Sequence, residues 1–222
     1  MEFSVKPVAK IRTDFDEKFG IPRQSGRVKT YGKIVFEPEY RDEAAIKEID
    51  GFDYLWLIFD FSEAHREKWS PTVRPPRLGG NRKVGVFASR SPFRPNHLGL
   101  SSVKLVGTER TEKFGTVLIV EGADLMDGTP ILDIKPYLRT DCHPDAKCGY
   151  ADETNDHFVK VVFPEELKKL LPCDKAEELE GCLREDPRPA YIDEERSYGV
   201  KFCGKNVKFT IKNDVLTVTD IE

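Results

Sequence analysis

Short apolar runs separated by turn-forming residues fill the first 137 residues, and this pattern limits the possible folds more than any other feature. Alternating or β-branched runs occur at 3–11, 31–38, 53–61, 83–88, 99–107, 115–121 and 128–137. One stretch, 38–52, instead predicts a short helix between a proline and a glycine. Many short strands of this kind favour a closed β-barrel over a doubly wound parallel sheet. We expect Leu55, Leu57 and Phe59 to be core residues of one buried strand.

The character of the sequence changes near residue 138. A polar, turn-rich stretch is followed by two short helical patterns, at 164–171 and 173–186, and then by alternating strands from 197 onward with turns at 204–206 and 213–214. These elements predict a small α+β unit. We therefore expect two domains, a mainly β domain at 1–140 and an α+β domain at 150–222.

The charge of the chain is unevenly distributed. The whole chain has a net charge of −4, but residues 66–104 contain nine lysines and arginines and a single acid, Glu67. A concentrated positive segment on an acidic protein attracts polyanions such as nucleic acids. A solvated charged face lying beside the acids of the chain is the other interpretation.

The segment at 85–99, GVFASRSPFRPNHLG, contains Arg90 and Arg94 together with two prolines that stiffen the backbone. Guanidinium groups bind carboxylates and phosphates with two parallel hydrogen bonds, so a rigid loop with two of them suggests an anionic ligand. A surface turn whose arginines pair with nearby acids would have the same composition.

Several other classes of protein do not fit the sequence. Cys142, His143 and Cys148 lack the paired C-x₂-C spacing of a zinc site, so we expect no bound metal. No phosphate-binding loop, dinucleotide fingerprint or G-x-S-x-G motif occurs. The five cysteines suggest no disulfide framework, and no membrane-length apolar run or signal-peptide core is present, which predicts a cytoplasmic protein.

The motif GVFASRSPFRPNHLG, preceded by RPPRLGGN and followed by DLMDGTPILDIKPY, resembles the TsaA/TrmO family of tRNA adenosine N6-methyltransferases. The resemblance extends from PRQ at 22–24 to Tyr137, and EDPRPAY at 185–191 resembles the shorter C-terminal domain of that family. It implies a single-sheet, non-Rossmann β-barrel that binds S-adenosylmethionine and acts as a homodimer. The implied substrate is N6-threonylcarbamoyladenosine at position 37 of tRNA, next to the anticodon.

The resemblance also implies site residues. For the cofactor these are Pro22, Arg23, Gln24, Ser62, Glu63, Arg90, Leu100, Gly122, Ala123, Asp124 and Leu125. For the tRNA, we expect contacts from Arg74 and Arg77 of the positive loop and from Arg94, whose alternative partner is an internal acid. The 150–222 domain is a further candidate tRNA contact, and Tyr191 either stacks on a base or belongs to the core of that domain. The sequence identifies no catalytic proton acceptor.

Two other functions are compatible with such a fold. One is a non-catalytic RNA- or nucleotide-binding β-barrel module, and the other is a dimeric scaffold whose proline-rich loop, 70–80, binds a partner. The joint presence of PRQ, RSPFRPN and DLMDGTP favours the methyltransferase, because a scaffold does not need such a set.

Overall fold

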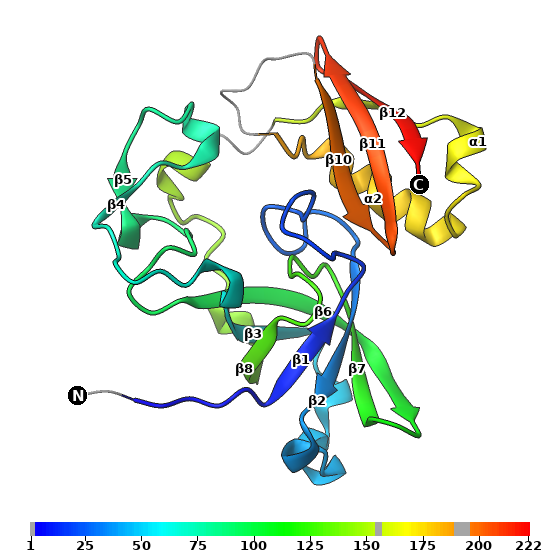
Figure 1. The fold of residues 1–222 in the computed structure, drawn as a ribbon. Coiled ribbons are helices and arrows are strands. Elements are labelled where there is room, and N and C mark those ends of the chain that lie inside the picture. Colours follow the sequence, from blue (N-terminus) through cyan, green and yellow to red (C-terminus); the bar gives the residue numbers. More distant parts are fainter. Residues whose placement is uncertain (1–2, 154–156, 189–195) are drawn as a thin grey trace.

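Six antiparallel strands form the larger sheet of the protein, whose computed structural model describes residues 3–153, 157–188 and 196–222 (Figure 1). They pair in the order β1-β2-β7-β6-β3-β8, and β1 also pairs with β8, so the sheet closes on itself. The strands are β1 (Ala9–Arg12), β2 (Tyr31–Phe36), β3 (Tyr54–Asp60), β6 (Leu98–Thr111), β7 (Gly115–Glu121) and β8 (Pro130–Pro136). The mostly β character predicted for this part of the chain is confirmed.

Alternate residues of these strands point into the closed sheet and form its core. Leu55, Leu57 and Phe59 of β3 are 1%, 0% and 4% exposed, so their prediction as core residues is confirmed. Gly99 of β6 lies opposite Phe59, and a Cβ at position 99 would lie 2.2 Å from the phenyl ring. The glycine of the HLG segment is therefore required by close packing inside the sheet.

The helix predicted over 38–52 is wrong. The segment forms three separate 3-10 turns, Pro38–Tyr40, Glu43–Ile46 and Ile49–Gly51. Asp42 is extended and its carboxylate accepts a hydrogen bond from the Ala44 amide at 2.9 Å, which starts a new turn. Glu48, which precedes the third turn, has a φ of 67°, a left-handed conformation that a continuous right-handed helix does not allow.

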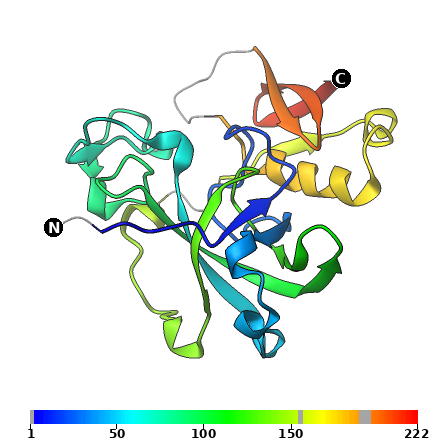
Figure 2. The ribbon, with the colours of Figure 1, turned by 60° about the horizontal axis from the view of Figure 1, so that its bottom comes forward.

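Two predicted strands are much shorter than expected. The run at 3–11 becomes a strand only at Ala9, and the strand expected over 83–88 is reduced to β5 (Val84–Gly85). β5 pairs with β4 (Thr72–Val73) in a small ribbon, and a 3-10 turn follows at Val86–Ala88. The ribbon belongs to the proline-rich loop, which stands beside the closed sheet in two views (Figures 1 and 2).

The C-terminal unit contains a second sheet with the order β10-β11-β12-β9, covered by two helices. Its elements are β9 (Lys160–Val162), α1 (Glu165–Lys168), α2 (Cys173–Arg184), β10 (Ser197–Phe202), β11 (Lys205–Lys212) and β12 (Val215–Ile221). The predicted helices and antiparallel meander are confirmed. Asn213 and Asp214 both have positive φ, at 49° and 57°, as a tight hairpin turn requires.

The hydrophobic core of the C-terminal unit includes residues from far earlier in the chain. Phe15 is fully buried there, with its ring centroid 5.3 Å from that of Phe202, and Phe19, Ile21 and Val28 pack against the same core. The segment between β1 and β2 thus fills a core formed mainly by residues after 157. The domain division at 1–140 and 150–222 stays a prediction. In the described part of the chain, no helix is long and apolar enough to cross a membrane.

Candidate functional site

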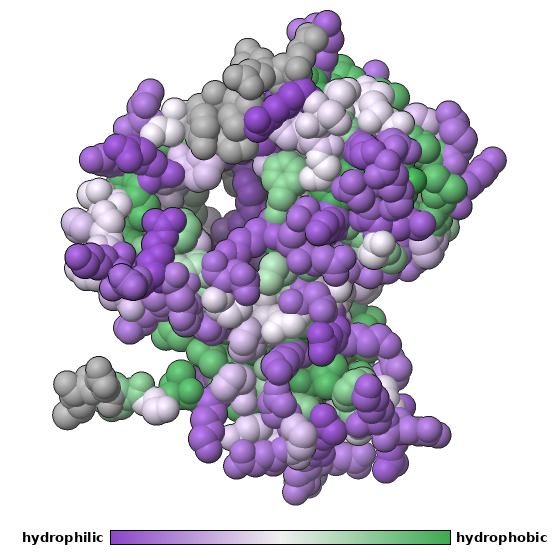
Figure 3. Space-filling view, viewed as in Figure 1, coloured by the Kyte–Doolittle hydropathy of each residue, from purple (hydrophilic) through white to green (hydrophobic). Residues whose placement is uncertain are grey.

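A cleft of about 1340 Å³ lies between the proline-rich loop and the C-terminal unit. Figure 3 shows the molecule hollowed at this place, with hydrophilic residues along much of the rim. Its charged lining comprises eleven cationic side chains and two carboxylates: Lys18, Arg23, Arg27, Arg66, Lys68, Arg74, Arg77, Lys83, Arg90, Arg94, Arg188, Glu185 and Asp186. The excess of positive charge makes the cleft suited to a polyanion.

Two of the predicted cofactor segments meet at this cleft. The exposed Arg90 guanidinium donates a hydrogen bond to the side-chain oxygen of Gln24, and the Gln24 amide donates to the Arg23 carbonyl at 2.6 Å. PRQ and RSPFRPN are therefore linked by side chains although 66 residues separate Gln24 from Arg90. Pro22, beside them, is buried.

The third predicted segment contributes Asp124. The buried Ser101 hydroxyl of β6 donates to its carboxylate at 2.6 Å. Burial raises the pKa of Asp124, while hydrogen bonds from Ser101 and from the backbone of Ser25, together with the positive charge of Arg90, oppose the rise. Asp124 therefore accepts a hydrogen bond from Ser101 and lies within electrostatic range of Arg90. We call Gln24, Arg90 and Asp124 together the cofactor corner.

Backbone hydrogen bonds hold the turn that carries Asp124. The Gly26 amide donates to the Gly122 carbonyl at 2.9 Å, and the Gly122 amide donates to the Thr30 carbonyl at 2.7 Å. Gly122 has a φ of 84°, and a Cβ there would lie 3.1 Å from Gly26, so glycine is required. Ala123 and Leu125 are buried, which places their side chains in the core, and their carbonyls accept hydrogen bonds from the hydroxyls of Thr30 and Thr13.

The remaining predicted cofactor residues lie elsewhere. Ser62 and Glu63 are exposed in a 3-10 turn after β3, next to the motif because the Phe61 amide donates to the His97 carbonyl at 2.8 Å. Leu100, 53% exposed, lies on the outer face of β6 opposite Ile58. None of the three lines the cleft.

A cluster of arginines and carboxylates, here called the inner cluster, joins the cleft wall to the end of α2. It consists of Arg23, Arg27, Arg77, Glu185 and Asp186. Arg77 donates to the backbone carbonyls of Glu185, at 2.9 Å, and Asp186, and Arg23 donates to the Glu185 carbonyl at 3.0 Å. Arg27 pairs with the Glu185 carboxylate. The Glu185 and Asp186 side chains are only 6% and 4% exposed, so these ion pairs connect the parts of the fold.

The three arginines predicted to contact RNA differ in their surroundings. Arg74 is exposed on the loop. The Arg77 side chain is only 12% exposed and is bound within the inner cluster. Arg94 donates to the Ser89 carbonyl at 2.8 Å and so fixes the motif loop. Arg74 is therefore the best placed of the three for a phosphate.

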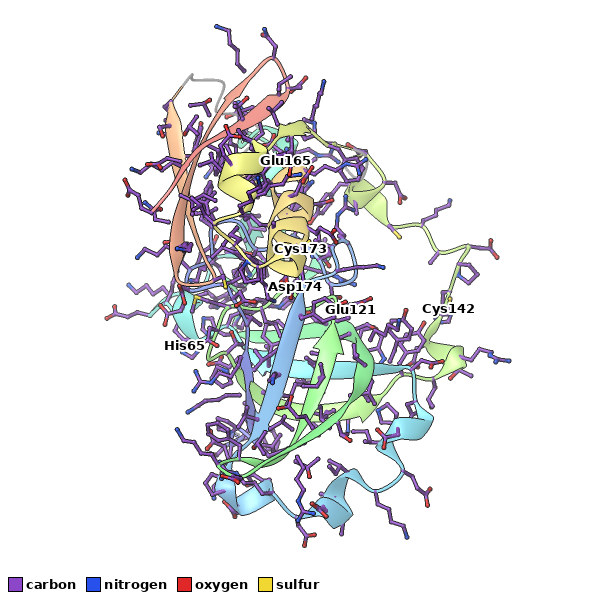
Figure 4. All side chains as sticks on the ribbon, turned by 90° about the vertical axis from the view of Figure 1, so that its right-hand side faces the viewer. His65, Glu121, Cys142, Glu165, Cys173 and Asp174 are labelled. Atoms are coloured by element: carbon purple, nitrogen blue, oxygen red, sulfur yellow. The ribbon has the colours of Figure 1, made fainter. Side chains whose placement is uncertain are left out.

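No group of three potential metal ligands occurs within the described ranges, and the five cysteines there are free. Cys142, on the connecting segment, and Cys173, at the start of α2, lie on different elements (Figure 4). Tyr191 lies outside the described residues.

Sequence reasoning missed Ser101 and Glu185. A polar residue at an inward position of an alternating strand was a signal for Ser101, because a buried hydroxyl needs a partner. Glu185 carried no comparable signal, since its partners Arg23 and Arg27 are about 160 residues away.

Both parts of the chain match models of one protein family. The tRNA-methyltransferase O N-terminal domain matches residues 10–142, and the TrmO C-terminal domain matches residues 157–222. A tRNA (adenine(37)-N6)-methyltransferase of Escherichia coli K12 is 37% identical over 99% of this chain and 98% of its own length. The protein of that name from Eikenella corrodens is 45% identical over 75% of this chain and 95% of its own.

A further relative and a solved structure agree with these matches. A Pseudomonas aeruginosa protein that carries the words S-adenosylmethionine-dependent methyltransferase in its name is 39% identical over 100% of this chain and 98% of its own. A crystal structure of TrmO from Pseudomonas aeruginosa, 33% identical, superposes with a TM-score of 0.78 over 100% of both chains.

Proposed function

Because the chain belongs to the tRNA-methyltransferase O family, we propose that it methylates N6 of threonylcarbamoyladenosine at position 37 of tRNA. The chain is an S-adenosylmethionine-dependent tRNA (adenine-37 N6)-methyltransferase, as its full-length likeness to enzymes of that name requires. The threonylcarbamoyl group on the substrate is the finer part of the proposal. The observation that carries the methyltransferase function is the meeting of Gln24, Arg90 and Asp124 beside a cationic cleft.

The cofactor corner has the donors and acceptors that S-adenosylmethionine needs. Arg90 supplies donors for a carboxylate, and Asp124 supplies an acceptor for an ammonium group or ribose hydroxyls. The buried Nε of Arg23 has no hydrogen-bond partner among the described residues, so donor capacity remains there for a ligand. Pro22, the 122–125 turn, Ser62, Glu63 and Leu100 complete the proposed set.

Positioning is the main task of these residues. S-adenosylmethionine supplies a methyl group already activated by a sulfonium. The corner orients the cofactor, and the cleft orients the base, so that the two reacting atoms meet in line. Pro92 and Pro95 stiffen the loop that holds Arg90 in place before binding, which lowers the entropy lost when the cofactor binds.

The cleft also supports the choice of tRNA region. Its cations bind phosphates without reading sequence, and the unpaired bases of an anticodon loop are accessible to side chains. Arg74 and the C-terminal unit are the proposed contacts, with Arg77 and Arg94 acting through the loop that they hold.

We further propose a cytoplasmic homodimer built on a single-sheet barrel. The closed strand order supports the barrel, and the five free cysteines support the compartment. Tyr54 of β3 and Leu98 and Leu100 of β6 are 44%, 46% and 53% exposed on one outer face, which supports pairing with a second copy. Mass measurement in solution by light scattering tests the dimer.

The substrate is tested by offering the enzyme two forms of one tRNA, with and without the threonylcarbamoyl group. We expect only the modified form to be methylated, as measured by nucleoside mass spectrometry. Equal methylation of both forms would contradict the proposed substrate and leave the methyltransferase activity in place. Binding of tRNA without methylation of either form would favour the non-catalytic module, which the matches to enzymes do not favour.

The cofactor corner is tested by Arg90→Ala. Loss of a charged hydrogen bond is expected to weaken binding of S-adenosylmethionine by about 1.5–3 kcal/mol, measured by calorimetry. Arg82→Ala, at an exposed pair with Glu153, is the matched control. Unchanged affinity in a folded Arg90→Ala protein would remove Arg90 from the site.

A further inference from the structure

Two exposed aromatic side chains lie in the cationic cleft without a role in the function proposed above. Trp69 is 52% exposed and Phe87 is 74% exposed, and both line the cleft. Their ring centroids are 6.4 Å apart with the planes inclined by 36°. Two large apolar rings that stay exposed to water side by side are stabilised when a partner covers them. The pair therefore marks a binding surface.

The β4–β5 ribbon brings the two rings together. Thr72 pairs with Gly85, and the Val86 amide donates to the Pro71 carbonyl at 3.0 Å. Trp69 precedes this pairing on one side and Phe87 follows it on the other. The rings therefore stand on a fixed ribbon, and little conformational freedom is lost when a ligand covers them.

The charge around the pair identifies the ligand. No acidic residue occurs between positions 68 and 108, and the exposed Lys68, Arg74 and Lys83 line the same cleft. Phe93 in this cleft differs from the pair, because the Arg66 guanidinium already covers its ring at 3.5 Å. Exposed aromatic rings among cations that follow a phosphate backbone are the arrangement by which proteins bind single-stranded nucleic acid.

We propose that Trp69 and Phe87 form a base-stacking platform for unpaired bases of the tRNA loop that flank the target adenine. The inference rests on the proposed function for its substrate, and it adds a binding contact for bases rather than phosphates. With the target base at the cofactor corner, the neighbouring bases lie along the cleft in which both rings stand. Every base has a stacking face, so the platform is expected to tolerate different flanking sequences.

Binding is tested with Trp56→Phe, which leaves Trp69 as the single tryptophan of the chain. Trp56 lies outside the cleft, where its indole donates to Asp141 at 2.8 Å. An anticodon stem-loop RNA is expected to quench the Trp69 fluorescence, and a fully paired duplex of the same length is expected to quench it much less. Equal quenching by the two RNAs, or no quenching, would overturn the proposal.

Turnover is tested with Trp69→Ala and Phe87→Ala. Each is expected to raise KM for tRNA about tenfold, with kcat and the affinity for S-adenosylmethionine unchanged. Trp69→Phe keeps an aromatic face and is expected to restore most of the loss, and Phe52→Ala, an exposed phenyl outside the cleft, is the matched control. A wild-type KM in both alanine variants would overturn the platform and leave the methyltransferase standing.

The fluorescence measurement also separates the two proposals. Quenching by the stem-loop alone, in a protein that methylates no tRNA, would support the platform and contradict the proposed function. Both rings are exposed, so the alanine variants are expected to fold, and denaturant unfolding checks this.

Discussion

Cationic side chains occur both at the inner end of the cleft, where the inner cluster lies, and at its exposed rim, but the surroundings of the two sets differ. At the inner end, Arg23, Arg27 and Arg77 bind Glu185 and Asp186, whose side chains are almost fully buried. At the rim, Lys68, Arg74 and Lys83 are exposed, and none has an ion-pair partner among the described residues. The same kind of charge therefore holds the fold together in one place and remains available to a ligand in the other.

The difference follows from desolvation. A buried carboxylate has lost its water and depends on its guanidinium partners, so removing one partner leaves an uncompensated charge. Exposed cations keep their hydration, cost the fold little and attract phosphate at long range. Three comparisons of variants test this contrast.

The largest effect is expected for Glu185→Ala. Arg23 and Arg27 would lose their carboxylate at a site where the Glu185 side chain is 6% exposed. We expect a loss of about 3–5 kcal/mol in the free energy of unfolding, measured with urea. Glu153→Ala breaks an exposed pair with Arg82, in which both side chains are about half exposed, and is expected to change stability by less than about 1 kcal/mol. Equal losses in the two variants would remove the contrast.

A smaller effect is expected from comparing Arg77→Ala with Arg74→Ala. Arg77→Ala removes two charged hydrogen bonds to backbone carbonyls and is expected to lower the free energy of unfolding by about 1.5–3 kcal/mol. Arg74→Ala is expected to leave stability unchanged, raise KM for tRNA and reduce the slope of binding against salt by about one.

The measurements are urea unfolding and tRNA binding over a range of salt concentrations. A destabilised Arg74→Ala, or an Arg77→Ala that only weakens tRNA binding, would reverse the assignment of the two residues.

The smallest effect is expected in the loss of folding stability at low pH. Burial raises the pKa of Asp186, but hydrogen bonds from Arg188 and His157 outweigh it and lower the pKa below its ordinary 3.8. A lowered pKa means that the folded state binds the proton less well than the unfolded state. The stability that Asp186 contributes is therefore full above about pH 4 and is lost as the pH falls through the lowered pKa.

Asp186→Asn is expected to lack this acid-dependent component. Unfolding free energies measured for both proteins from pH 6 down to pH 3 check this. A parallel decline in the two proteins would show that Asp186 does not titrate in this range.

Much of the fold followed from local pattern. The strands of the closed sheet and of the C-terminal meander alternate with period two, and the β11–β12 turn carries asparagine and aspartate where positive φ is needed. The helix prediction for 38–52 was wrong because the spacing of apolar residues does not record local caps. Asp42 and Glu48 divide this segment into separate turns. The cofactor residues came from motifs, and the structure brings Gln24, Arg90 and Asp124 together without testing their roles.

The sequence by itself determined the β-rich architecture, the family and the positive segment, because periodicity, motif and charge are properties of neighbouring residues. Only the tertiary structure decided which cations are free and which are bound. Arg74 and Arg77 are three residues apart in one loop, yet the end of α2, more than 100 residues later, binds Arg77 and leaves Arg74 exposed. Trp69 and Phe87 likewise became a pair only through the β4–β5 register. Burial and pairing depend on which distant segments pack together, and a linear pattern does not record that.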